Sequence, residues 1–253
     1  MIGALAGAAL ALSLPGALAG RTSAPGVTAS SILLGGTAPL SGPETAYAPV
    51  ARGAQAYFAY VNAHGGVHHR KIAYRVVDDG YDPARTIQAT RRLVQQDHVF
   101  AIFNSVGTEH VLAVRPFLNA LHVPQLFVGS GAAAIATQHR RYPWTMGYLP
   151  SFVGEGAVYG RYVRKHLKRT TVAVLYENSL YGDELLRGLR SGLKGKVRIE
   201  PCTSITSSLP ARSCRRSMFC VITARTSPRR SSSASARCAA FGSAWTSIEI
   251  RGA

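Results

Sequence analysis

The apolar and polar positions of this chain follow two alternating periods from residue 30 to about residue 195. Short apolar runs of strand length occupy residues 32–36, 71–78, 99–103, 125–128 and 171–176. Between them, apolar residues recur every three or four positions, which predicts helices near residues 47–61, 83–96, 108–121, 152–166 and 182–193. Strands that alternate with helices indicate βαβ units and a parallel sheet wrapped by helices, so the sequence predicts the α/β fold class.

Ligands of open parallel sheets bind beyond the carboxyl ends of the strands, which directs attention to the loops that follow each strand. Two of these loops are rich in small and hydroxyl residues: Asn-Ser-Val-Gly-Thr at 104–108 and Gly-Ser-Gly-Ala-Ala at 129–133. Backbone amides at such strand-to-helix junctions can hold an anion such as a carboxylate. Small residues also simply permit tight turns, and composition alone favours neither interpretation.

Catalytic, metal and nucleotide motifs find little support in the sequence. The run Gly-Ser-Gly at 129–131 lacks the spacing of a nucleophile elbow. The aspartates within 78–82 fit a strand-end turn and a helix cap better than an acid–base or metal cluster, and the histidines within 64–69 flank a double-glycine turn without further ligands at suitable spacing. No phosphate-binding glycine motif follows a strand. We therefore expect no catalytic residue, no metal and no cofactor.

The charge of the chain is high, with 29 Lys and Arg against 12 Asp and Glu, a net charge of +17. Residues 211–253 contribute +7 of this, from eight Arg and the single acid Glu249. The basic residues before this segment lie mostly on predicted helix surfaces and loop tips without interleaved aromatic residues, so we expect no nucleic-acid partner. Because 25 of these last 43 residues are Ser, Arg or Ala, without a regular apolar period, the composition predicts disorder there.

The first twenty residues resemble a secretory signal peptide. No charged residue occurs from Ile2 to Ala19, and the segment ends in Ala-Leu-Ala before Gly20. An uncleaved membrane anchor is the alternative, and the shortness of the segment and its interruption by Pro15 disfavour it. We therefore expect residues 1–20 to be a signal peptide and the protein to be periplasmic or extracytoplasmic.

Several segments together resemble the extracytoplasmic solute-binding proteins of branched-chain amino-acid (Leu/Ile/Val-binding) ABC importers. These segments are Gly35–Gly42, Val61–Gly66, Arg70–Ile72, Asp78–Pro83, Val123–Phe127, Pro143–Gly147 and Tyr176–Asp183. Their order and spacing over residues 30–200 carry the resemblance. It implies a periplasmic-binding-protein type I clamp with two parallel-sheet lobes, which closes over a small amino-acid-like ligand and delivers it to ABC permease subunits in the membrane.

The resemblance also implies a domain organisation. Lobe one would occupy residues 28–148 and an incomplete lobe two residues 149–205. Residues 206–253 form the Ser/Arg/Ala-rich tail, which we interpret as the product of a reading-frame shift that truncates the family pattern. A sensory receptor with the same clamp fold remains an alternative function, and an α/β hydrolase remains a less favoured one.

Binding residues are implied only through the resemblance. In the family, hydroxyls and backbone amides of the third and fourth loops of lobe one hold the ligand's α-carboxylate. The matching positions here are Ser105, Val106, Gly107, Gly131, Ala132 and Ala133. Tyr47 matches an aromatic residue of lobe one that shapes the pocket, and Tyr181 matches one of lobe two that closes over the ligand. The family usually has Thr or Ser near Ala133, so amides, urea-like solutes and aromatic acids also remain candidate ligands.

Overall fold

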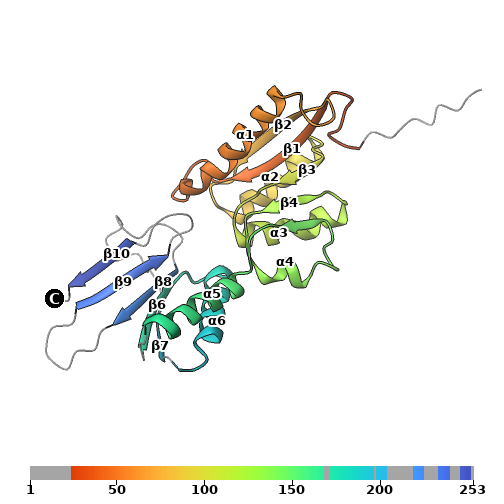
Figure 1. The fold of residues 1–253 in the computed structure, drawn as a ribbon. Coiled ribbons are helices and arrows are strands. Elements are labelled where there is room, and N and C mark those ends of the chain that lie inside the picture. The colour runs from red at the N-terminus through yellow and green to blue at the C-terminus, as the bar shows by residue number, and fades with distance from the viewer. Residues whose placement is uncertain are drawn as a thin grey trace, which may run out of the picture.

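The computed structural model describes residues 24–167, 171–196, 198–203, 219–224, 233–239 and 246–251. Two lobes are visible, each built around a five-stranded sheet, and the chain passes from one to the other between β5 and α5 (Figure 1). The expected signal peptide lies outside the described residues. Within the described part of the chain, no helix is both long and apolar enough to cross a membrane.

Lobe one contains a wholly parallel sheet in the order β2-β1-β3-β4-β5. Its strands are β1 (Ser31–Ala38), β2 (Lys71–Asp78), β3 (Ala101–Phe103), β4 (Gln125–Val128) and β5 (Thr145–Gly147). Its helices are α1 (Ala48–Ala63), preceded by the 3-10 turn η1 (Thr45–Tyr47), α2 (Pro83–Gln95), α3 (Thr108–Ala120) and the short α4 (Ala133–Thr137). Because all five strands run the same way, the loops that follow them gather at one edge of the sheet.

Both faces of this sheet are covered by helices that bury their apolar stripes. On one face, α2 and α3 pack against the sheet through a core of Leu93, Val99, Ile102, Val114 and Leu118. On the other face, α1 packs through Phe58 against a smaller core that includes Leu34 and Ala101. Burial on both faces explains why the β1 residues from Leu34 to Ala38 are all buried and why the strand reads as a nearly continuous apolar run.

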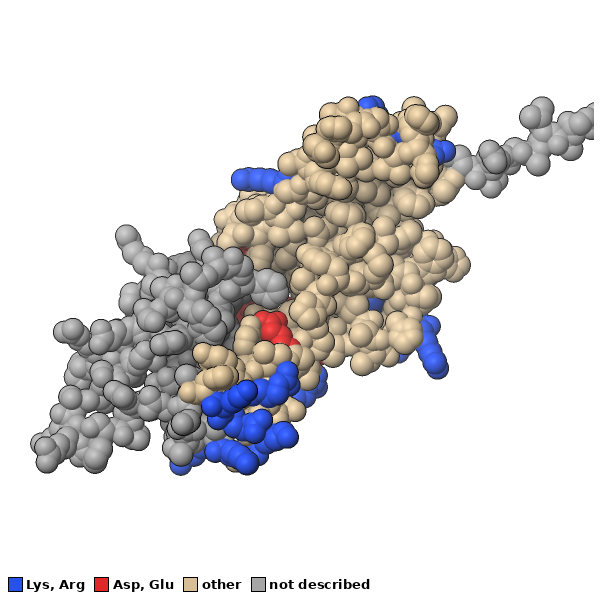
Figure 2. Space-filling model, viewed as in Figure 1, with Lys and Arg blue, Asp and Glu red and all other residues tan. Residues whose placement is uncertain are grey.

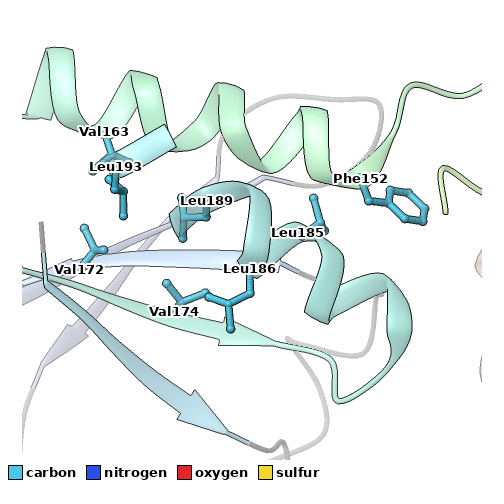
Figure 3. Close-up of a cluster of buried hydrophobic side chains, with 8 residues drawn as sticks. All are labelled: Phe152, Val163, Val172, Val174, Leu185, Leu186, Leu189 and Leu193. Carbon is cyan, nitrogen blue, oxygen red and sulfur yellow. The ribbon is translucent and has the colours of Figure 1, made fainter. Parts of the chain in front are cut away.

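Lobe two contains a mixed sheet in the order β10-β9-β8-β6-β7. Its elements are α5 (Phe152–Tyr162), the π-helical turn η2 (Val163–Leu167), β6 (Thr171–Tyr176), α6 (Leu180–Leu193), β7 (Arg198–Thr203), β8 (Phe219–Ala224), β9 (Ser233–Ala239) and β10 (Thr246–Arg251). In Figure 3, α6 lies between α5 and the strands, and its leucines meet Val172 and Val174 of β6 in one apolar cluster.

The α/β class expected from the sequence is confirmed, but the second sheet differs from the parallel arrangement that the resemblance implies. Only β6 and β7 pair in parallel, whereas β8 pairs antiparallel with β6 and the last three strands form an antiparallel meander. These three strands also lie where composition predicted disorder. The average composition conceals a local run, Phe-Cys-Val-Ile-Thr at 219–223, whose aromatic and β-branched residues favour a strand.

Candidate functional site

The two small-residue loops of lobe one lie side by side and are joined by backbone hydrogen bonds. A parallel bridge pairs Val106 with Gly129. The amide of Gly129 donates to the carbonyl of Ser105 at 2.8 Å, and the amide of Gly107 donates to the carbonyl of Gly129 at 3.3 Å. Gly107 has φ +108°, a value that L side chains rarely adopt, and it caps α3. The sequence therefore located the loops correctly, but the Gly107 amide serves to hold them together.

The hydroxyl groups of these loops also have partners inside the protein. Ser105 is only 1% exposed, and its hydroxyl accepts a hydrogen bond from the Thr37 hydroxyl at 3.1 Å. The hydroxyls of Thr108 and Ser130 share a hydrogen bond of 2.9 Å, and the amide of Ala132 donates to the Ser130 hydroxyl at 3.2 Å. These bonds fix the edge of the sheet. A contact between the Ser105 hydroxyl and a ligand stays a prediction.

Gly131 and Tyr181 come together around Phe152, the first residue of α5. The carbonyl of Gly131 accepts a hydrogen bond from the Phe152 amide at 2.9 Å, and a Cβ at Gly131 would overlap the carbonyl oxygen of Pro150. The Phe152 ring meets Tyr181 edge to face, with ring centroids 4.7 Å apart. Gly131 therefore allows the close approach of the segment that connects the lobes, a role that the sequence analysis did not anticipate.

A buried carboxylate from lobe two reaches the fourth loop of lobe one. Oε2 of Glu184 on α6 accepts a hydrogen bond from the Ala133 amide at 2.8 Å, and the Glu184 residue is only 4% exposed. A second hydrogen bond between the lobes runs from the Leu180 amide to Oε1 of Glu109, at 3.3 Å. We call the region of these contacts, formed by residues 104–109, 129–133, 180–181 and Glu184, the lobe junction.

Glu184 was missed by the sequence analysis, although a signal for it exists. It lies three residues after Tyr181 and directly before Leu185, on the stripe of α6 that carries the apolar residues. A charged side chain on such a stripe is unusual unless it is paired. Here the backbone amide of Ala133 and the guanidinium of Arg187, at 3.4 Å, provide the partners.

Tyrosine side chains lie beside the junction in both lobes. The rings of Tyr47 and Tyr81 stack at 5.7 Å with an interplanar angle of 17°, and Tyr81 in turn contacts the His110 ring at 4.3 Å. Burial raises the pKa of Tyr81 and of Tyr181, and the Tyr47 hydroxyl interacts electrostatically with both. Tyr47 and Tyr181, the two aromatic residues implied by the resemblance, therefore lie within electrostatic reach of each other.

Carboxylates accompany these tyrosines, and acidic atoms are visible between the lobes in Figure 2. Partial burial raises the pKa of Glu44 in lobe one, and the charge of Glu177 in lobe two raises it further. Burial likewise raises the pKa of Glu177, opposed by a hydrogen bond from Ser179, with a smaller raising contribution from the charge of Glu109. The junction is therefore an acidic, tyrosine-lined region.

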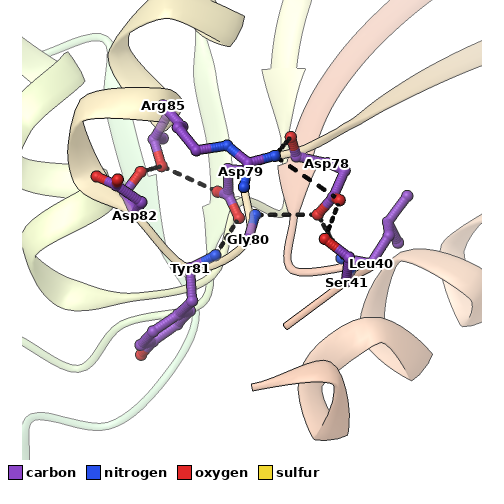
Figure 4. A network of polar contacts seen from close by, with 9 residues as sticks. Leu40, Ser41, Asp78, Asp79, Gly80, Tyr81, Asp82 and Arg85 are labelled. Atoms are coloured by element: carbon purple, nitrogen blue, oxygen red, sulfur yellow. Dashed lines mark hydrogen bonds and ion pairs between the residues drawn. The ribbon is translucent and has the colours of Figure 1, made fainter. Parts of the chain in front are cut away.

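The aspartates at the end of β2 position Tyr81 (Figure 4). Asp79 is fully buried and accepts hydrogen bonds from the Tyr81 amide at 3.0 Å and from the Thr86 hydroxyl at 2.9 Å. Asp82 caps α2 by accepting from the Ala84 amide at 2.8 Å, which confirms the predicted cap. These residues act as turn and cap residues, as the sequence analysis preferred.

Two further observations concern sites outside the junction. A groove of about 540 Å³ lies between the end of α3 and the segment before β5, and none of the eight residues implied by the resemblance lines it. Among the described residues, no group of three or more His, Cys, Asp or Glu side chains is arranged to hold a metal ion.

The sequence of this chain is similar to a known protein family and to individual curated proteins. A sequence profile of a family described as "Periplasmic binding protein" matches residues 31–198. "Leu/Ile/Val-binding protein homolog 1" of Brucella abortus (strain 2308) is 27% identical over 164 residues, which cover 61% of this chain and 41% of that protein. The chain thus spans about two fifths of the length of this curated relative.

Two solved structures show the same fold. The branched-chain amino acid transporter substrate binding protein LivJ from Streptococcus pneumoniae, in complex with isoleucine, aligns with a TM-score of 0.64 at 21% identity and covers 72% of this chain and 52% of its own. A solute binding protein of an ABC transporter from Rhodopseudomonas palustris BisB5, in complex with 3,4-dihydroxy benzoic acid, aligns with a TM-score of 0.55 at 22% identity and covers 68% of this chain and 46% of its own.

Proposed function

The chain belongs to the periplasmic binding protein family, and on that premise we propose that it captures a small amino-acid-like solute outside the cytoplasmic membrane and delivers it to an ABC permease. The names of the relatives support a role in binding rather than catalysis, since they describe Leu/Ile/Val-binding and solute-binding proteins. Because the family is described as periplasmic, we also propose that residues 1–20 direct export of the protein. The proposed role requires no cofactor.

The observation that carries this proposal is that tyrosines of both lobes lie within electrostatic reach of each other. Tyr47 lies in lobe one and stacks on Tyr81, and Tyr181 lies in lobe two and meets Phe152 edge to face. A solute bound between them would contact both lobes and would hold them closed. We propose that the ligand contacts come from Tyr47, Ser105, Val106, Gly107, Gly131, Ala132, Ala133 and Tyr181.

Thermal unfolding of the full chain with and without solute tests this function. Millimolar leucine, isoleucine, leucinamide or 3,4-dihydroxybenzoate should raise the midpoint of unfolding, because a ligand that binds only the folded state stabilises it by mass action. Tyr47→Ala should abolish the shift. Tyr57→Ala is the matched control, because Tyr57 is 63% exposed on α1 and contacts Tyr60 rather than the tyrosines of the junction.

Either of two outcomes would contradict the proposal. If none of the solutes shifts the midpoint, or if Tyr47→Ala and Tyr57→Ala retain the same shift, the junction is not the binding site of an amino-acid-like solute.

A further inference from the structure

The hydrogen bond between Glu184 and Ala133 places a carboxylate of the protein itself at a position that the family resemblance reserves for a ligand's carboxylate. The Ala133 amide donates to Glu184 Oε2 at 2.8 Å, and the Glu184 residue is 96% buried. A short hydrogen bond from a backbone amide to a buried carboxylate is among the stronger contacts in proteins. The amide is therefore occupied when the lobes are together.

Two neighbouring amides also donate to groups within the protein. The Gly107 amide donates to the Gly129 carbonyl, and the Ala132 amide donates to the Ser130 hydroxyl. The resemblance implies six loop positions as carboxylate contacts. Three of them have backbone amides that donate to acceptors within the protein: Gly107, Ala132 and Ala133. A ligand carboxylate that used one of these three amides would have to break its bond, and breaking the bond of Ala133 would leave Glu184 buried with Arg187 as its remaining partner.

The negative charge at this position also disfavours a ligand carboxylate. Glu109 accepts a hydrogen bond from the Leu180 amide within the junction, at 3.3 Å. Arg187, the cation paired with Glu184, has a side chain that is 64% exposed. A second carboxylate beside Glu184 would therefore meet the negative charge of Glu184 in a partly dehydrated region, which is unfavourable.

From this geometry we propose that Glu184 is a specificity-determining residue, which occupies the anion position of the lobe junction so that the site takes neutral or cationic solutes, such as amides and amines, in preference to free carboxylates. The assignment rests on the proposed function and specifies its substrate class. Specificity of this kind arises because the disfavoured ligand is repelled and leaves a buried polar group unpaired.

The test compares leucine with leucinamide, which differ at the carboxyl group, by titration calorimetry on the full chain. The wild type should bind leucinamide at least tenfold more tightly than leucine. Glu184→Ala, which frees the Ala133 amide and removes the charge, should tighten leucine binding about tenfold and leave leucinamide within about threefold. Glu184→Gln, which keeps the size of the side chain and removes only the charge, should shift the ratio in the same direction.

Asp183→Asn is the matched control, because Asp183 is an exposed carboxylate on the same turn of α6. It changes the net charge by the same amount as Glu184→Gln and should leave the leucine-to-leucinamide ratio unchanged. An unchanged ratio in both Glu184 variants, or an equal change in Asp183→Asn, would overturn the specificity assignment.

A measurement without ligand separates this assignment from the proposed function. Hydrogen exchange of the Ala133 amide should be at least tenfold faster in Glu184→Ala than in the wild type or in Asp183→Asn. Equal exchange in all three would overturn the assignment. If exchange responds as expected but no variant binds either probe, the proposed function fails and the specificity assignment fails with it, whereas binding of both probes at a constant ratio overturns the assignment alone.

Discussion

Asp78 shows how a single side chain fixes the position of two loops of lobe one. Its Oδ1 accepts hydrogen bonds from the amides of Leu40 and Gly80, each at 2.9 Å, and from the Ser41 amide at 3.2 Å, while Oδ2 accepts from the Ser41 hydroxyl (Figure 4). These bonds, the one from the Ser41 hydroxyl first, lower the pKa of Asp78 to about 2. The loop after β1 is thereby tied to the loop after β2.

Replacement of this carboxylate should destabilise the protein at neutral pH and not in acid. We expect Asp78→Asn to lower the free energy of unfolding by about 1 kcal/mol at pH 7, because hydrogen bonds to a charged acceptor are stronger than those to an amide oxygen. The folded pKa lies below the ordinary 3.8, so the contribution is present above 3.8 and is lost as the pH falls toward 2. Urea unfolding of both proteins between pH 7 and pH 3 measures this difference, and a difference that stays constant over the range would contradict it.

The sequence located the candidate site through Ser105, Gly107 and Gly131 but not the partners of these residues. Loop positions follow from the strand ends, so a period-based analysis finds them. The contacts of Ser105 with Thr37 and of Ala133 with Glu184 join residues 68 and 51 positions apart, and no local pattern specifies which distant group reaches an amide. Tyr81 was passed over because its neighbours Asp79 and Asp82 accounted for the turn.

At the scale of elements, the closest packing in lobe two is between α5 and α6. Each helix carries two glycines four residues apart, Gly156 and Gly160 on α5 and Gly188 and Gly192 on α6. A Cβ at any of them would overlap a backbone carbonyl oxygen of the opposite helix. The glycines therefore let the two backbones approach directly, and α6 can pack its leucines on β6 at the same time.

We expect Gly188→Ala to lower the free energy of unfolding by about 2 kcal/mol, because the added methyl group meets the Val153 carbonyl and forces the helices apart. Gly53→Ala is the control within a helix. Nothing lies within 4 Å of a Cβ at Gly53, so this change should stabilise α1 by about 0.5–1 kcal/mol. Denaturant unfolding of the two variants decides the matter, and loss of stability in both or in neither would show that the helix contact is not as close as described.

The elements that the sequence predicted and those it missed differ in the strength of their sequence signal. Strands β2, β4 and β6 have the bounds expected from their apolar runs, and Asp82-Pro83 correctly located the start of α2. The five-residue α4 and the three-residue β5 were not predicted, since neither completes two periods of its pattern. Strands β7 to β10, of six or seven residues each, were not predicted either. The segment of the π-helical turn η2 was predicted as the continuation of α5.

At the scale of the whole molecule, the net charge of +17 conceals an acidic junction within a basic protein. Figure 2 shows Lys and Arg gathered on the outer surface of lobe two, whereas acidic atoms lie between the lobes. The net charge of +7 carried by residues 211–253 therefore does not by itself indicate a partner of the molecule. The frame-shift interpretation of residues 206–253 stays a prediction, which resequencing of the coding DNA would check.

Charge at the junction should make the association of the lobes depend on pH. Partial burial and then the charge of Glu177 in lobe two raise the pKa of Glu44 in lobe one, and burial raises the pKa of Glu177, with a smaller contribution from the charge of Glu109. Oε2 of Glu44 is buried without a hydrogen-bond partner among the described residues. A carboxyl whose folded pKa is raised binds its proton more tightly in the folded state. Stability of the closed arrangement is therefore greatest below the ordinary value of 4.5 and falls as the pH rises above it, the opposite direction to the contribution of Asp78.

Glu177→Gln removes one of the two facing charges and should weaken this dependence. Between pH 4.5 and pH 8, we expect the radius of gyration of the wild type, measured by small-angle X-ray scattering, to increase as the lobes separate, and that of Glu177→Gln to increase less. Asp183→Asn, with the same change of net charge at an exposed position of α6, should behave as the wild type. Equal behaviour of all three proteins would show that the repulsion between Glu44 and Glu177 does not govern the junction, whereas a difference confined to Glu177→Gln would make this pair the element through which pH controls closure.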